Sequence, residues 1–103
     1  MADLETPTTA SASKPRLLFF YSPQDGHARR VDGYLAQVLQ RRQNHETFIV
    51  HRIEMSSRAD MVERFRATPG PALIVIEDRV IRARLDRPKS AKAIAELLEP
   101  WLH

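Results

Sequence analysis

Two short, continuous apolar runs constrain the fold of this 103-residue chain more than any other feature. They cover residues 17–21 and 72–76, and each is as long as a strand. Runs of this kind are typical of strands that are buried on both faces of a sheet. The second run is followed by Glu77-Asp78-Arg79 and then by an alternating segment, residues 80–85. Because Asp78 tolerates a positive φ, the sequence predicts an antiparallel hairpin at this turn.

The segments between these strands show helical and strand periodicity. Residues 47–53 alternate as a further strand, and Ser56 and Ser57 offer N-cap oxygens to a short helix over 58–66. Ser90 is the expected cap of a final helix. The longest helix is expected to run to about Gln43, and its core-facing positions recur at helical spacing: Ala28, Val31, Leu35, Val38 and Leu39. In the last strand we expect Ile81, Ala83 and Leu85 on one face and Arg82 and Arg84 on the other.

The resulting element order is β-α-β-α-β-β-α, which places the chain in the α/β class. A long helix joins the first two strands and suits a right-handed parallel crossover, whereas the last two strands are too close for anything but a hairpin. One four-stranded mixed sheet flanked by helices satisfies every element. We therefore expect a single domain over residues 15–103. Residues 1–14 are rich in Thr, Ala and Ser without apolar periodicity, so they are expected to form a disordered tail.

Composition excludes several classes of function. The chain has no cysteine, which rules out disulfides, thiolate metal sites and a thiol nucleophile. Sixteen basic and 13 acidic residues give a formal charge of +3, a mild bias that is no nucleic-acid signature. No apolar run has the length of a membrane helix, and no export signal is visible, so we expect a cytoplasmic protein without membrane partners. The predominance of Arg over Lys suggests a bacterial, GC-rich source.

From Arg16 to the C-terminus the sequence resembles the thioredoxin family. Leu18-Phe19-Phe20-Tyr21-Ser22-Pro23 is similar to the family's first core strand, which leads into its active-site turn. Gly70-Pro71-Ala72-Leu73-Ile74 resembles its cis-proline loop and the apolar strand that follows. Glu77-Asp78-Arg79-Val80 resembles the turn between its last two strands. The resemblance implies a thioredoxin-like fold over these residues.

The positions at which the sequence differs from that family determine which reactions the chain can catalyse. Asp25-Gly26-His27-Ala28 stands where the family has Cys-x-x-Cys, and Phe19 stands where it has a buried aspartate. Thiol exchange requires a thiolate that attacks a disulfide, and no residue here can form one. Dithiol oxidoreductase activity is therefore excluded for this chain.

The proline loop is the family feature that remains. In redox members its backbone offers hydrogen bonds to an extended stretch of the client, so Gly70 and Pro71 are candidate binding residues by a mode like β-augmentation. Pro71 can equally serve only to set the turn into the next strand. Pro69 is the alternative cis-proline, because Ala67-Thr68-Pro69 also resembles a segment of another non-redox protein of this fold.

Asp25 and His27 allow two interpretations at the start of the long helix. They could act as a general base and its orienting partner in a non-thiol enzyme. The simpler interpretation makes Asp25 the N-cap and His27 an exposed first-turn residue. We favour the simpler one, because no nucleophile or oxyanion site accompanies them apart from Ser22 and Tyr21, and we assign no catalytic residue.

The leading hypothesis is a redox-inactive, thioredoxin-like protein that binds another protein as an adaptor, chaperone-like or regulatory module. The binding edge would combine the vestigial active-site turn with the proline loop: Tyr21, Gln24, Asp25, His27, Gly70 and Pro71. The alternatives are polyanion or nucleic-acid binding through Arg29, Arg30, Arg82 and Arg84, and the non-thiol enzyme. We expect no cofactor and no metal site, since the four His residues show no ligand spacing. The protein partner is unidentified, and a homodimer remains open.

Overall fold

The observed elements follow the predicted order. The computed structural model describes residues 14–102, without the side chains of Arg42, Gln43 and His45. The strands and helices are β1 (Arg16–Tyr21), α1 (Gly26–Gln40), β2 (Ile49–Glu54), α2 (Ala59–Phe65), β3 (Ala72–Glu77), β4 (Val80–Asp86) and α3 (Ala91–Leu98), with 3-10 helices at Arg41–Glu46 and Glu99–Trp101. The expected tail, residues 1–14, lies outside the described residues except for Lys14, which pairs with Glu46 at 3.1 Å.

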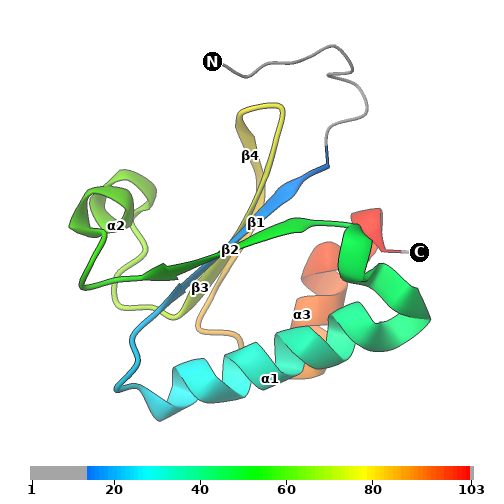
Figure 1. The fold of residues 1–103 in the computed structure, drawn as a ribbon, viewed down its shortest axis with the longest axis horizontal. Helices are drawn as coiled ribbons and strands as arrows, with labels where there is room; N and C mark the ends of the chain where they lie inside the picture. The colour runs from blue at the N-terminus through cyan, green and yellow to red at the C-terminus, as the bar shows by residue number, and fades with distance from the viewer. Residues whose placement is uncertain (1–13, 103) are drawn as a thin grey trace.

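The four strands form one mixed sheet in the order β2-β1-β3-β4 (Figure 1). Strands β1 and β2 are parallel, whereas β3 runs antiparallel to both β1 and β4. Helices α1 and α3 lie on one face, and α2 lies on the other face near one end of the sheet (Figure 1). The predicted α/β architecture is confirmed. Across residues 14–102, no helix combines the length and apolar character that crossing a membrane requires.

Strands β1 and β3 are buried on both faces, as their continuous apolar sequences predict. Successive side chains point to opposite faces of a strand, so Leu17 and Phe19 pack beneath α1 and α3, whereas Leu18 and Phe20 pack toward α2. Fully burying an apolar side chain of this size contributes about 1.5–3 kcal/mol. The two central strands therefore supply both layers of the core, and their ends position the loops that form the candidate site.

The predicted antiparallel hairpin between β3 and β4 is confirmed, and its turn is one residue shorter than expected because Glu77 belongs to β3 and pairs with Val80. Asp78 and Arg79 both adopt positive φ, at 55° and 68°, which is the geometry of a type I′ turn. The faces of β4 differ from the prediction. Val75 pairs with Ala83 but Ile76 pairs with Ile81, so Arg82 is an additional residue in a β-bulge. Ile81 therefore shares the face of Ile76 and is 48% exposed, whereas Ala83 packs against the core on the face that α1 and α3 cover.

Two helix boundaries also differ from the sequence-based expectation. The long helix ends at Gln40, and residues Arg41–Glu46 continue as a 3-10 helix. The predicted caps of the second helix were wrong: Ser56 and Ser57 donate to the carboxylate of Glu54, and the N-cap position is Arg58, which makes no capping bond. Both hydroxyls are directed to the side chain at the end of β2, and neither accepts a hydrogen bond from the first amides of α2. The cap at Ser90 is confirmed, since its Oγ accepts from the amide of Ala93 at 3.1 Å.

His51 on the edge strand β2 gives the stability a pH dependence. Its Nε2 lies 2.9 Å from Nη1 of Arg16, and burial, followed by the charge of Arg16, lowers the pKa of His51 below 6.5. The unfolded chain then binds the proton more tightly than the folded one. We expect the free energy of unfolding to decrease as the pH falls from 7.5 to 5.5. Urea unfolding at both pH values measures this, and His51→Gln should flatten the dependence; an unchanged dependence would contradict the assignment.

Candidate functional site

Asp25 caps helix α1, as the simpler interpretation of the sequence predicts. Its Oδ1 accepts a hydrogen bond from the backbone amide of His27 at 2.9 Å. Its own amide donates to the carbonyl oxygen of Ser22 at 3.0 Å, which closes the turn that follows β1. A cap of this kind stabilises a helix by about 1 kcal/mol. Gln24 is exposed on the turn, where its Oε1 accepts from the hydroxyl of Ser22 at 3.2 Å.

The His27 side chain points toward the loop before α3. It does not form an acid–base pair with Asp25. Its Nε2 lies 2.7 Å from the carbonyl oxygen of Pro88, so this nitrogen must carry hydrogen and donate. The Asp25 carboxylate is meanwhile bound to the backbone amide of His27. The two side chains each bind backbone groups, and this arrangement does not build the general base that the enzyme hypothesis requires.

The proline loop contains two cis peptide bonds, Thr68–Pro69 and Gly70–Pro71. Both alternatives that the sequence left open are therefore cis. Gly70 and Pro71 are buried, whereas Thr68 and Pro69 are exposed. The Arg87 guanidinium donates to the carbonyl oxygen of Gly70, and the Arg87 amide donates to that of Pro71 at 2.8 Å. Direct binding through Gly70 and Pro71 stays a prediction; the part of the loop that solvent reaches is Thr68–Pro69.

The loop after β4 links the predicted parts of the site and was not identified from the sequence. Arg87 holds the proline loop, and its neighbour Pro88 accepts from His27 at the start of α1. Arg87 also has a positive φ of 50°. No motif marks these residues in the sequence, because both contacts involve positions that are distant along the chain. Their hydrogen bonds connect the turn and the proline loop into one edge.

A groove lies beside the exposed part of the proline loop, and we call it the proline-loop groove. It has a volume of about 540 Å³ and lies between α2 and the ends of β1 and β2. Its wall is largely apolar, and Glu63 supplies the charged side chain. The lining residues are Ser22, Met55, Ser56, Ala59, Val62, Glu63, Thr68 and Pro69.

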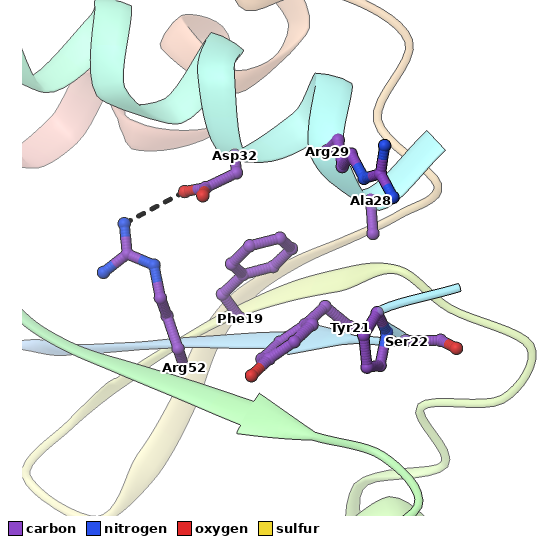
Figure 2. Close-up of a pocket in the computed structure, with 8 residues that line it drawn as sticks. Phe19, Tyr21, Ser22, Ala28, Arg29, Asp32 and Arg52 are labelled. Atoms are coloured by element: carbon purple, nitrogen blue, oxygen red, sulfur yellow. Dashed lines mark hydrogen bonds and ion pairs between the residues drawn. The ribbon is translucent and has the colours of Figure 1, made fainter. Parts of the chain in front are cut away.

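A second hollow, the aromatic pocket, lies on the other side of the turn, under the start of α1 (Figure 2). It has a volume of about 310 Å³, and Ser22 lines it as well as the groove. Phe19 is 2% exposed and forms part of the floor. Arg52 of β2 pairs with Asp32 of α1 at 3.0 Å over this pocket (Figure 2). No sequence motif indicates that these two residues meet, since they are 20 positions apart on different elements.

The predicted binding residues occupy different parts of this edge. Tyr21 is half-buried in the aromatic pocket, and Asp25 and His27 hold the turn. The arginines of the polyanion hypothesis do not gather on one surface. Arg84 donates to the carbonyl oxygens of Phe65 and Arg66 at the end of α2, whereas Arg29 and Arg30 lie on α1 across the sheet. The described side chains bring no three His, Asp or Glu residues together as metal ligands.

Solved structures identify the fold. Comparison of the sequence with protein-family models and with curated proteins finds no match. The structure is similar to a thioredoxin-like protein, Trxlp, from Edwardsiella tarda, with a TM-score of 0.74, 19% identity and coverage of 87% of both chains. It is also similar to the germline-specific thioredoxin Deadhead of Drosophila melanogaster, with a TM-score of 0.75, 14% identity and coverage of 91% of this chain and 87% of that one. Mitochondrial thioredoxin 3 of Saccharomyces cerevisiae gives a TM-score of 0.71 at 11% identity, with 89% and 83% covered.

The chain therefore has a thioredoxin-like fold. It differs from a dithiol oxidoreductase at the point where chemistry would occur, because Gly26, His27 and Ala28 follow the Asp25 cap and the chain contains no cysteine. Without a thiolate it cannot exchange disulfides itself. What the fold retains is the edge at which the turn, the proline loop and the two hollows meet.

Proposed function

We propose that this protein is a redox-inactive binding module that holds an extended segment of another protein in the proline-loop groove. The observation that carries the proposal is the groove itself, an open hollow of about 540 Å³ walled by α2 and the exposed Thr68–Pro69 segment. Met55, Val62 and Pro69 offer apolar surface there. Extended peptides commonly dock with their main chain along such an edge and one side chain in a pocket.

The surroundings define which segment fits. An aliphatic or aromatic side chain would replace water against Met55 and Val62, which contributes binding energy in proportion to the apolar area covered. The carboxylate of Glu63 on the rim favours a neutral or basic residue beside that side chain. Gln24 and Thr68 are exposed polar side chains at this edge and can bond the main chain of the segment. The role is adaptor-like or regulatory, because binding is the only chemistry it requires.

The hydrogen bonds that support this edge favour binding over catalysis. Arg87 and Pro88 hold the proline loop and the α1 turn through hydrogen bonds, so the edge is organised before a partner arrives. A preorganised edge loses less conformational entropy on binding. By contrast, Asp25 and His27, the titratable pair at the turn, are both bonded to backbone groups.

Selection from a phage-displayed library of random peptides tests this function. We expect enriched peptides with an apolar residue beside a neutral or basic one. Ala59→Glu places a longer, charged side chain against the apolar wall at an exposed position of α2, and it should weaken binding of the enriched peptides with a neutral residue at least about tenfold. Ala36→Glu, the same change at an exposed position of α1, is the matched control and should leave the affinity unchanged. Equal binding by wild type and Ala59→Glu would contradict the proposed site.

A further inference from the structure

The aromatic pocket is a separate hollow with a chemical character of its own. Its floor contains the rings of Phe19 and Tyr21, whose centroids are 5.6 Å apart and whose planes are tilted by 37°. Figure 2 shows the Phe19 ring between the strands and the first turns of α1, with the Tyr21 ring beside it. Pro23 and Ala28 complete the apolar lining. Such a floor accepts a flat ring, because aromatic pairs are favourable at tilted geometries with centroids 4.5–7 Å apart.

The rim of this pocket is cationic. Arg29 and Arg52 line it together with a single anionic side chain, Asp32. Arg52 uses Nη2 for its 3.0 Å contact with Asp32, and a guanidinium carries five N–H donors in all. The side chains of Arg52 and Asp32 are about half exposed, at 52% and 49%, so solvent and solutes reach this pair. A planar guanidinium at the edge of an apolar hollow is suited to a carboxylate.

We propose that the aromatic pocket binds a small aromatic carboxylate, with its ring against Tyr21, above the buried Phe19, and its carboxylate bound by Arg52. The volume of about 310 Å³ is at the small end for ligand pockets, which suits one ring with a short acidic arm. A free aromatic acid and the aromatic C-terminal residue of a polypeptide both carry a ring and a carboxylate. This site is independent of the proline-loop groove, apart from Ser22, which lines both.

Titration with 3-phenylpropionate, followed in two-dimensional ¹H–¹⁵N NMR spectra of the full chain, tests the proposal. We expect saturable shifts of the Tyr21, Ala28 and Asp32 amides, with a dissociation constant on the order of 1 mM, as suits a ligand of this size. The uncharged 3-phenylpropanol and the ring-free hexanoate should each bind at least about tenfold more weakly, because each lacks one of the two recognised groups.

Arg52→Gln is the variant that separates this site from general adsorption. It removes the cation at an exposed position and should weaken binding about tenfold, whereas Arg64→Gln on α2 should have no effect. Acetyl-Gly-Gly-Phe with a free C-terminus distinguishes the sources: tighter binding than 3-phenylpropionate indicates a polypeptide end, and weaker binding indicates a free acid. The proposal is overturned if neither compound gives saturable shifts, if 3-phenylpropanol binds equally well, or if Arg52→Gln binds as wild type does.

Discussion

Phe19→Asp is expected to lower the free energy of unfolding at pH 7 by about 4 kcal/mol or more, which would leave the chain largely unfolded. Phe19 is 2% exposed and packs in the core beneath α1 and α3. The substitution removes an aromatic side chain and buries a carboxylate, at the position where the sequence resemblance to thioredoxins implies an aspartate. Urea unfolding followed by circular dichroism measures the loss.

Two further measurements make the cause of that loss testable. Phe19→Leu keeps the site apolar and should cost only roughly 1 kcal/mol. Burial raises the pKa of a carboxyl group, so the folded Phe19→Asp variant would bind its proton more tightly than the unfolded chain does. The difference in free energy of unfolding between this variant and wild type should therefore become smaller as the pH falls from 7 to 4. An aspartate tolerated at pH 7 without loss of stability would show that the pocket is polar and hydrated.

Gly70→Ala is expected to destabilise the protein by about 2 kcal/mol, whereas Gly33→Ala should stabilise it by about 0.5 kcal/mol. Gly70 has a φ of +71°, and an added Cβ would lie 2.7 Å from Sδ of Met55 and 3.3 Å from the carbonyl oxygen of Ala67. Gly33 lies inside α1 with no heavy atom within 4 Å of such a Cβ. The two substitutions are chemically identical, so opposite signs isolate the effect of the loop.

The same substitution also affects the proposed groove. Met55 lines the groove, and moving its sulfur away from Gly70 changes the apolar wall. We therefore expect Gly70→Ala to weaken binding of the selected peptides even in the fraction that remains folded, whereas Gly33→Ala should bind normally. Thermal unfolding and peptide affinity, measured on both variants, check this pair of results. A stabilised Gly70→Ala variant would contradict the described loop conformation.

Local sequence signals were sufficient for most of the fold. The continuous runs at β1 and β3 predict strands that are buried on both faces, and Asp78 predicts the turn that joins β3 to β4. The caps at Asp25 and Ser90 are likewise local, since each side chain bonds an amide two or three residues ahead. The bulge at Arg82 is not local. It depends on how β4 pairs with β3, and that pairing moved Ile81 to the opposite face from the one expected.

The candidate site was only partly predictable, because it also depends on contacts between residues that are distant along the chain. The turn and the proline loop are short motifs, and both could be predicted from the sequence. The groove depends on Met55 and α2, and the aromatic pocket depends on Arg52 reaching Asp32 from another element. Arg87 donates hydrogen bonds to the carbonyl oxygens of Gly70 and Pro71. These contacts could not be predicted from the sequence. They leave Thr68 and Pro69 as the part of the loop that solvent reaches.

The most direct test of the account is to locate where a selected peptide binds. Uniformly ¹⁵N-labelled protein would be titrated with the tightest library peptide, and the amide shifts mapped onto the structure. We expect shifts concentrated at Met55, Ala59, Val62 and Thr68, with the same pattern lost in Ala59→Glu and retained in Ala36→Glu. Shifts concentrated elsewhere, for example on the exposed face of α1 around Ala36, would contradict the claim that this thioredoxin-like fold works through its proline-loop edge.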